Sequence, residues 1–170
     1  MTPLETEHLK LREFRLDDAG FVLRLLNEPS FLHFIGDKGV RNLDDARQYI
    51  LNGPIASYKK HGFGLYLVQL KSTETSIGMC GLLKRDTLPD IDIGFAFLPA
   101  FWNKGYAFES AAAIMAYAKN VLKLPRIVAI TDKDNEASGK LLEKLGLIFD
   151  RIIDLSGKGD ETRLFVPNEG

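Results

Sequence analysis

The stretch of sequence that decides the fold is Asp90-Ile-Asp-Ile-Gly-Phe-Ala-Phe-Leu-Pro-Ala-Phe-Trp-Asn-Lys-Gly-Tyr-Ala-Phe-Glu109. At its start, apolar residues alternate with small or polar ones at the period-two spacing of a β-strand, at Ile91, Ile93, Phe95 and Phe97. Pro99 has no backbone N–H group and cannot extend a sheet, so the strand is expected to end before it. An Ala-rich run over residues 108–119 then predicts a helix. The stretch therefore predicts a strand, a short loop and a helix.

Gly105 lies where this loop meets the helix. The first N–H groups of a helix have no internal partner and point outward at the positive end of its dipole. A glycine lets a ligand approach the backbone closely, so the expected guest is a phosphate or pyrophosphate. The loop Asn103-Lys-Gly-Tyr106 lacks both the Gly-Lys-Ser/Thr ending of a Walker loop and the three glycines of a dinucleotide fingerprint. Taken alone, it is also compatible with a purely structural turn.

Composition limits the classes of function. A chain of 170 residues with 45% hydrophobic content suits one domain with a sizeable core. The formal net charge is -1 and the basic residues form no run, which argues against a nucleic-acid partner. The polar N-terminal residues include no apolar signal segment, and no apolar run approaches the ~20 residues that span a bilayer, so no membrane partner is expected.

Cysteine and histidine usage points to a cytoplasmic protein without a metal. Cys80 is the single cysteine, so no internal disulfide or cysteine-based metal cluster forms, and a reducing compartment is expected. Cys80 itself lies within an apolar run and is expected in the core. The three histidines have no mutual spacing typical of a metal site, at His8, His33 and His61.

The order of elements predicts a mixed α/β domain. Period-two and short apolar runs predict seven strands, over residues 9–14, 63–70, 77–83, 91–97, 126–131, 148–155 and 163–166. Helical spacing predicts four helices, over residues 17–26, 42–60, 108–119 and 135–145. Gly53-Pro54 is expected to interrupt or kink the second helix. Residues 31–39 have no clear period and are expected to form an aromatic-rich loop.

Trp102-Asn-Lys-Gly-Tyr-Ala107 resembles the acetyl-coenzyme A loop of the GNAT N-acetyltransferase superfamily, Gln/Arg-x-x-Gly-x-Gly/Ala. Trp102 replaces the usual Gln or Arg, and together with Glu109 this replacement is similar to the Rim-type branch, which contains ribosomal-protein N-terminal acetyltransferases. Three other segments resemble Rim-type sequences in their expected places, Leu4–Arg12, Leu26–Pro29 and Asn135–Gly146. The resemblance implies a single GNAT domain over residues 1–170, with a central mixed, mostly antiparallel sheet of about seven strands and four helices on both faces.

The resemblance also implies a coenzyme site. The pantetheine arm of acetyl-CoA would pair like an extra strand with the backbone around Phe97 and Leu98. The pyrophosphate would take the N–H groups of the loop and first helical turn, those of Asn103, Lys104, Gly105, Tyr106, Ala107 and Phe108. Asn135 would contact the pantetheine, and the same residue is suited to be a helix N-cap.

Acetyl transfer to an amine sets the chemistry that the remaining residues must supply. An α-amine with a pKa near ~8 or a lysine near ~10.4 is mostly protonated at neutral pH, so a base within reach assists the attack. Asp92 occupies a strand position where relatives carry an acidic base; alternatively, it is a structural carboxylate bound to solvent or an arginine. Ser138 matches a serine that Rim-type enzymes place near the coenzyme sulfur. Many relatives carry an acid tyrosine at the position of Leu142, so no tyrosine acid is expected here.

The function expected from these residues is acetyl transfer from acetyl-CoA to a primary amine, by direct attack in a ternary complex. The acceptor is a protein N-terminus or a small amine, and the protein is a monomer or a homodimer. Acceptor contacts are expected from Phe31, His33 and Phe34, whose alternative role is to cover the core. The rival function is that of a non-catalytic acyl-CoA-binding sensor, which Leu142 favours.

Overall fold

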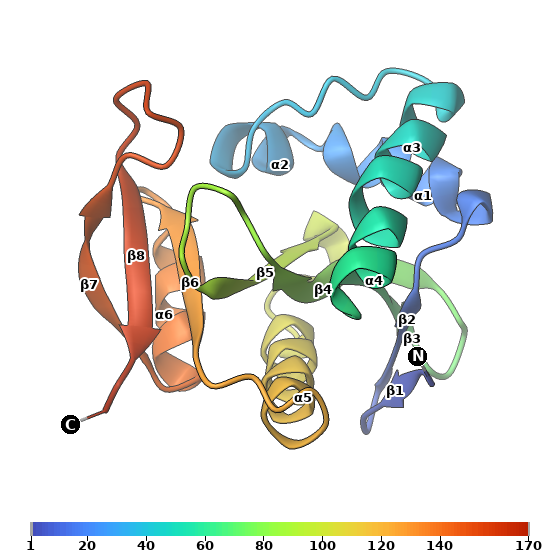
Figure 1. The fold of residues 1–170 in the computed structure, drawn as a ribbon. Coiled ribbons are helices and arrows are strands. Elements are labelled where there is room, and N and C mark those ends of the chain that lie inside the picture. The colour runs from blue at the N-terminus through green and yellow to red at the C-terminus, as the bar shows by residue number, and fades with distance from the viewer. Residues whose placement is uncertain (1, 170) are drawn as a thin grey trace.

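The structure is a computed structural model that describes residues 2–169, and it is built on one eight-stranded sheet (Figure 1). The strands lie in the order β1-β2-β3-β4-β5-β6-β8-β7. β5 and β6 run parallel, and the other neighbouring strands run antiparallel. The strands span Leu4–Glu5 (β1), Leu9–Glu13 (β2), Leu65–Leu70 (β3), Ser76–Leu83 (β4), Ile91–Phe97 (β5), Ile127–Asp132 (β6), Leu147–Ile153 (β7) and Thr162–Pro167 (β8).

Helices cover both faces of the sheet, as the family resemblance implies (Figure 1). They span Ala19–Leu26 (α1), Pro29–Phe34 (α2), Leu43–Ile50 (α3), Ala56–His61 (α4), Tyr106–Asn120 (α5) and Glu136–Lys144 (α6). Short 3-10 turns occupy Leu16–Asp18 and Pro99–Phe101. No helix among residues 2–169 is both long and apolar enough to cross a membrane.

Two details of the fold differ from the prediction. The sheet has eight strands rather than about seven, because Leu4–Glu5 pairs with β2 and adds a short edge strand. The helices number six rather than four within the described residues. Part of the predicted loop 31–39 belongs to α2, which begins with Pro29 at its first position, where a missing N–H group costs nothing. The predicted second helix is divided into α3 and α4 by a π-turn at Leu51–Ile55 that contains Pro54.

The alternation of side chains along the strands separates two hydrophobic clusters. One cluster joins α5 and α6 to one face of the sheet, with Tyr66, Val68 and Leu82 from the strands. The other joins α1, α2 and α3 to the opposite face, with Leu65 and Leu67 from the same strand as Tyr66. The buried side chain of Cys80 belongs to the first cluster, as predicted. Strand β5 therefore lies between two layers of helices.

β5 and β6 pair over only part of their length. The parallel register joins Ile91 to Ile127 and Asp92 to Val128, and no further pair follows among the described residues. The remaining five residues of β5 and the later residues of β6 therefore diverge, and β6 continues its pairing with β8 from Ala129 onward. This divergence leaves one edge of β5 without a neighbouring strand at the end that leads into α5.

Close packing of β4 against β3 makes Gly81 a sensitive position. A Cβ atom there would lie 2.1 Å from the carbonyl oxygen of Gly64 and 2.7 Å from the Cα of Leu65, both of them backbone atoms. We expect Gly81→Ala to lose about 1–3 kcal/mol of unfolding free energy, because the strands must separate. The control is Gly20→Ala in α1, where a Cβ meets nothing within 4 Å and should stabilise slightly. Urea unfolding of both variants measures the free energy of unfolding. A Gly81→Ala variant as stable as wild type would contradict the close approach of β4 to the backbone of Gly64 and Leu65.

Candidate active site

The loop between β5 and α5 presents a run of unpaired backbone N–H groups. The N–H group of Trp102 donates to a carbonyl in the preceding turn at 3.1 Å, and that of Glu109 donates to the carbonyl of Gly105 at 3.0 Å. Between them, the N–H groups of Asn103–Phe108 find no acceptor within residues 2–169. Gly105 has a φ of 83°, and open space lies where a side chain would project. Such a run at a helix N-terminus is suited to a pyrophosphate.

Trp102 fixes this loop to the end of β5. Its indole N–H donates to the carbonyl of Phe97 at 2.9 Å, although the side chain is 44% exposed. The position at which relatives carry Gln or Arg is thus filled by a residue that bridges the strand and the loop. The exposed side chain of Lys104 lies in the same loop and adds positive charge.

The unpaired edge of β5 offers backbone groups to an extended ligand. Leu98 donates its N–H to the carbonyl of Ile77 at 2.9 Å, and alternate residues of an antiparallel ladder direct their backbone groups to opposite edges. Phe95 and Phe97 therefore direct theirs away from β4. The carbonyl of Leu98 accepts from Phe101, so both backbone groups of Leu98 are engaged within the protein. The backbone contact predicted at Leu98 is therefore better proposed at Phe95, and the one at Phe97 is kept for its N–H group, because the carbonyl of Phe97 already accepts the indole N–H of Trp102.

Asn135 and Ser138 meet at the start of α6. The side-chain oxygen of Asn135 accepts the backbone N–H of Ser138 at 3.2 Å, which is the N-cap role that the sequence predicts. In the described part of the chain, the amide nitrogen of Asn135 and the hydroxyl of Ser138 have no hydrogen-bond partner, so both remain available to a ligand. Leu142 is 1% exposed and belongs to the core, so it offers no proton donor.

Asp92 is fully buried and is held by one arginine. Its Oδ1 accepts the Nε–H of Arg85 at 3.1 Å, whereas its Oδ2 has no hydrogen-bond partner within the described residues. Burial raises the pKa of the Asp92 carboxyl, and the neighbouring positive charge of Arg85 offsets only part of this rise. A carboxylate with a raised pKa and one unpaired oxygen is suited to be a general base, but Oδ2 is itself buried, so an acceptor reaches it only when the side chains around it move.

Comparison with known proteins decides the family. Residues 8–148 match the family model described as the acetyltransferase (GNAT) domain. This chain belongs to the GNAT family. YoaA of Bacillus subtilis (strain 168), named an uncharacterized N-acetyltransferase, is 28% identical over 145 residues, which cover 84% of this chain and 81% of YoaA.

Solved structures share this GNAT fold over nearly the whole chain. An acetyltransferase from Agrobacterium tumefaciens str. C58 superposes with a TM-score of 0.84 at 23% identity, covering 99% of this chain and 95% of that one. RimL, a ribosomal L7/L12 α-N-protein acetyltransferase solved in complex with coenzyme A, has a TM-score of 0.80 at 16% identity, covering 95% and 94%. Rim-type enzymes are thus among the structural neighbours.

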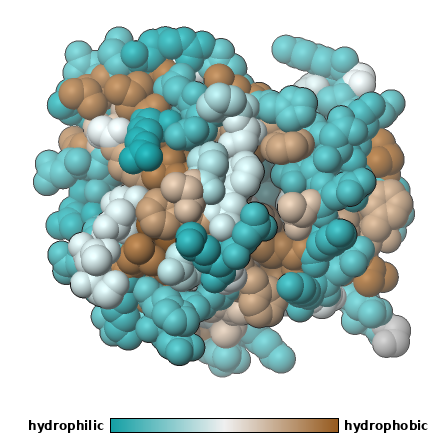
Figure 2. Space-filling view, turned by 180° about the vertical axis from the view of Figure 1, so that it is seen from behind, coloured by the Kyte–Doolittle hydropathy of each residue, from teal (hydrophilic) through white to brown (hydrophobic). Residues whose placement is uncertain are grey.

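GNAT enzymes transfer acyl groups and use acetyl-CoA as the donor. The residues of this chain fit that coenzyme. The free N–H groups of Asn103–Phe108 suit its pyrophosphate, and the unpaired edge of β5 at Phe95 and Phe97 suits its extended pantetheine arm. Seen from behind, the molecule is hollowed between the part built by its N-terminal helices and the part built by β7 and β8 (Figure 2).

The three predicted acceptor residues lie on α2, but they are not equivalent. Phe31 is 4% exposed and packs in the cluster of α1 and α3, so it has the core-covering role given above as its alternative. His33 is exposed and Phe34 half-buried, and their rings meet edge to face at a centroid distance of 4.6 Å. We therefore keep only His33 and Phe34 as acceptor candidates on this helix.

Arg85 and Tyr49 are candidate site residues that the sequence analysis missed. Arg85 lies in a connection that reads as a turn, and Tyr49 has the spacing of a core residue in a helix. Only the fold brings Arg85 to Asp92 and packs Tyr49 against the cluster on the same face of the sheet as Ala96. The alternation along β5, which places Asp92 on one face with Gly94 and Ala96, was the one signal that pointed to this face.

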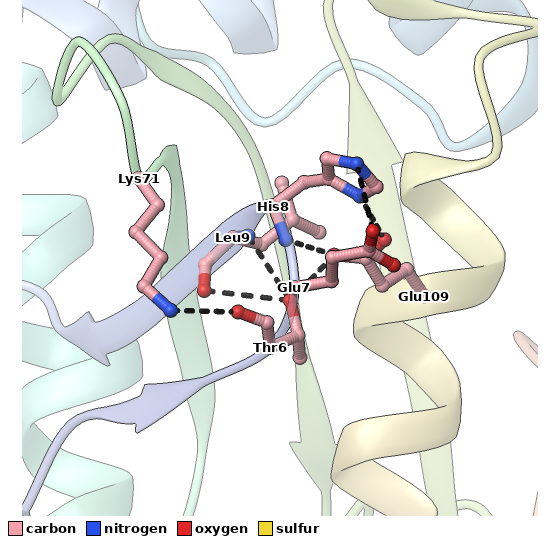
Figure 3. Close-up of polar contacts among 6 residues, drawn as sticks. All are labelled: Thr6, Glu7, His8, Leu9, Lys71 and Glu109. Atoms are coloured by element: carbon pink, nitrogen blue, oxygen red, sulfur yellow. Dashed lines mark hydrogen bonds and ion pairs between the residues drawn. The ribbon is translucent and has the colours of Figure 1, made fainter.

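Glu109 joins the first turn of α5 to the turn between β1 and β2 (Figure 3). Its carboxylate accepts the hydroxyl of Thr6 and the backbone N–H of His8 at 3.0 Å, and its other oxygen lies 2.8 Å from His8 Nδ1. Lys71 donates to the carbonyl of Thr6 at 3.0 Å and supports the same turn. Glu109 thus has specific structural partners, and they hold the helix that follows the loop of free N–H groups.

The His8–Glu109 contact predicts a pH-dependent contribution to stability. The hydrogen bond to Glu109 raises the pKa of His8, although desolvation opposes it. Because the folded pKa lies above the unfolded value of about 6.5, the stabilisation is complete below that pH and is lost as the pH rises through the folded pKa. We expect His8→Gln to melt a few degrees below wild type at about pH 6 and close to it at about pH 9. A difference that is constant with pH, measured by calorimetry, would exclude the charged pair.

Proposed function

We propose that this protein is an N-acetyltransferase that moves the acetyl group of acetyl-CoA to a primary amine in a ternary complex. The observation that carries this proposal is the run of free N–H groups at Asn103–Phe108, which opens α5 directly beside the unpaired edge of β5. A pyrophosphate held there would direct the pantetheine arm along β5, toward Asn135 and Ser138 at the start of α6. In this proposal residues 1–170 act as one acetyltransferase domain, in the cytoplasm.

Each proposed catalytic group has one task. Asp92 Oδ2 takes a proton from the ammonium form of the acceptor, which frees the nitrogen lone pair. The amine then attacks the thioester carbonyl, a C–N bond forms, and collapse of the intermediate breaks the C–S bond. The second proton of the nitrogen leaves during collapse and neutralises the thiolate, through water and the Ser138 hydroxyl. The Asn135 amide donates to the pantetheine and holds the thioester in place.

The rival function is that of a non-catalytic acyl-CoA-binding sensor. Leu142 favours it, because this side chain is buried in the core at the position where many relatives have an acid tyrosine. The free Oδ2 of Asp92 favours catalysis, because a sensor needs no base on this face of the sheet. Both functions require the same coenzyme loop, so binding of acetyl-CoA does not separate them.

Thiol release separates the two functions. Purified protein is mixed with acetyl-CoA and a panel of primary amines that includes small amines and peptides with free N-termini. The expected result is amine-dependent release of coenzyme thiol, with the acetylated amine detected by mass spectrometry. Tight acetyl-CoA binding without thiol release for any amine would assign the protein to the sensor class.

Ser138→Ala tests the group near the coenzyme sulfur. Because a neutral hydrogen bond contributes roughly 0.5–1.5 kcal/mol, kcat should fall several-fold to about tenfold. The backbone N–H of Ser138, which Asn135 caps, is kept in this variant, so α6 should not be disturbed. Steady-state kinetics at saturating acetyl-CoA measures the effect. An unchanged kcat would remove Ser138 from the chemistry.

A further inference from the structure

Arg163 of β8 reaches into the connection between β6 and α6. Its Nη2 donates to the carbonyl of Asn135 at 2.8 Å and to the carbonyl of Asp132 at 3.4 Å. Asp132 is the last residue of β6, and Asn135 is the N-cap of α6. One guanidinium therefore bridges the two ends of this connection and holds its backbone.

This arginine is not explained by an ion pair. Among residues 2–169 its guanidinium contacts no carboxylate, and its buried Nε has no hydrogen-bond partner. Its Cζ lies 5.4 Å from the centre of the Phe165 ring, whose face attracts a cation. A positive charge beside the N-terminus of a helix opposes the helix dipole. The contacts that distinguish Arg163 are therefore its hydrogen bonds to the two carbonyls.

Gly139 leaves the room that this guanidinium occupies. A Cβ atom at Gly139 would lie 3.1 Å from both Nη1 and Nη2 of Arg163. Gly139 lies inside α6, where a glycine is less favourable than an alanine. Its N–H group donates to the carbonyl of Asn135 at 3.3 Å, the same carbonyl that Arg163 binds. The packing of Arg163 thus accounts for a glycine in the interior of a helix.

The bridge ends on the part of α6 that is proposed to meet the pantetheine arm. The side-chain oxygen of Asn135 accepts the backbone N–H of Ser138 at 3.2 Å, so the two residues keep a fixed relation to each other. The backbone of Asn135, which Arg163 holds, therefore sets the place of both side chains. Misplacement of a positioning group by about 1 Å can slow a reaction on the order of 100-fold.

We propose that Arg163 is a positioning residue for acetyl transfer, which holds Asn135 and Ser138 where the pantetheine arm and the thioester lie. This inference rests on the proposed function. Arg163 acts through the backbone of the connection between β6 and α6 and takes no part in the proton transfers. The free N–H groups of Asn103–Phe108 open a different helix, so binding of the pyrophosphate does not depend on Arg163.

The first test compares the binding of acetyl-CoA with that of ADP, which carries a pyrophosphate but no pantetheine arm. Arg163→Met keeps an unbranched stem over the Phe165 ring and loses the hydrogen-bond donors. We expect its affinity for acetyl-CoA to fall about tenfold by calorimetric titration, with its affinity for ADP unchanged. Arg163→Lys keeps the charge and a donor, so its affinity for acetyl-CoA should be partly restored.

Arg151→Met is the matched control. Arg151 is an exposed arginine of the neighbouring strand β7, and it pairs with Asp150 at 3.2 Å. The substitution removes the same side chain without touching the connection between β6 and α6. Both affinities and kcat should stay at their wild-type values.

The second test is a double-mutant cycle on the rate. At saturating acetyl-CoA, Arg163→Met should lower kcat about tenfold and leave the KM of the amine unchanged. Gly139→Ala crowds the guanidinium and should lower kcat a few-fold. In the Arg163→Met background Gly139→Ala should cost nothing further, because the group that it displaces is gone. Gly139→Ala also keeps the test valid if Arg163→Met fails to fold.

Several results would overturn the positioning role. One is a folded Arg163→Met with wild-type affinity for acetyl-CoA and wild-type kcat. Others are equal losses of acetyl-CoA and ADP affinity, or rate losses that add across Arg163 and Gly139, since these indicate only a loosened fold. A wild type that binds acetyl-CoA but releases no thiol with any amine would instead overturn the proposed function, and the binding comparison would still test Arg163.

Discussion

Gly105→Asp should lose acetyl-CoA affinity by on the order of 100-fold, because it places a carboxylate where the pyrophosphate is expected. A Cβ at Gly105 meets nothing within 4 Å, so the new side chain projects into the open space in front of the loop. The positive φ of 83° makes any side chain there somewhat strained, and Asp and Asn are among the residues that tolerate this conformation best. Calorimetric titration with acetyl-CoA measures the affinity.

Two controls separate charge, shape and backbone strain. Gly105→Asn keeps the shape without the charge and should lose less affinity. Gly62→Asp introduces the same side chain at a φ of 80° with open space around it, at the end of α4. It should lose a similar amount of stability but keep wild-type affinity. If folded Gly105→Asp binds acetyl-CoA as tightly as Gly62→Asp does, the loop is not the coenzyme site.

Asp92→Asn should lower kcat by on the order of 100-fold and flatten the rising limb of the pH–rate profile, because the amide cannot take a proton. The position of that limb is expected above the ordinary pKa of an aspartate, since burial raises the pKa of Asp92. Single-turnover rates from about pH 6 to about pH 9 measure both effects. If Asp92→Asn keeps the wild-type rate and the same rising limb of the pH–rate profile, the amine loses its proton to bulk water.

The same variant has a stability signature with a defined sign. A folded-state pKa above the unfolded value of about 3.9 means that Asp92 favours the fold below that value. This contribution is lost as the pH rises through the folded pKa. The stability of wild type relative to Asp92→Asn should therefore fall over that pH range. A relative stability that rises instead would mean that the ion pair with Arg85 outweighs burial.

Local sequence patterns were enough to predict strand β5, the loop that follows it and the helix after that loop. The alternation at Ile91–Phe97, the end of the strand before Pro99 and the Ala-rich run each express a local preference that the fold does not override. The run of free N–H groups at Asn103–Phe108 could be predicted for the same reason, because it depends on neighbouring residues alone. The short strand Leu4–Glu5 could not be predicted, because it exists only through its pairing with β2.

The acceptor side of the site depends on contacts distant in sequence, and there the sequence was less informative. Phe31 reads like an accessible aromatic residue in a loop, but α2 directs it into the core. Arg85 belongs to a polar turn, and only its contact with Asp92, seven residues on in the neighbouring strand β5, makes it a candidate site residue. The partners of Glu109 lie more than 100 residues away, at Thr6 and His8, so only its place in the first turn of a helix could be predicted.

A single-turnover experiment with acetyl-CoA labelled in its acetyl group tests the central claim most directly. The protein is held in excess over acetyl-CoA, mixed with an accepted amine and quenched at increasing times. We expect the label to pass from the thioester to the amine while an equal amount of free coenzyme thiol is released. No label should accumulate on the protein, and Gly105→Asp should slow the transfer at the same concentrations. Label that stays on a tightly bound thioester in the presence of every amine, or that accumulates covalently on the protein, would contradict it.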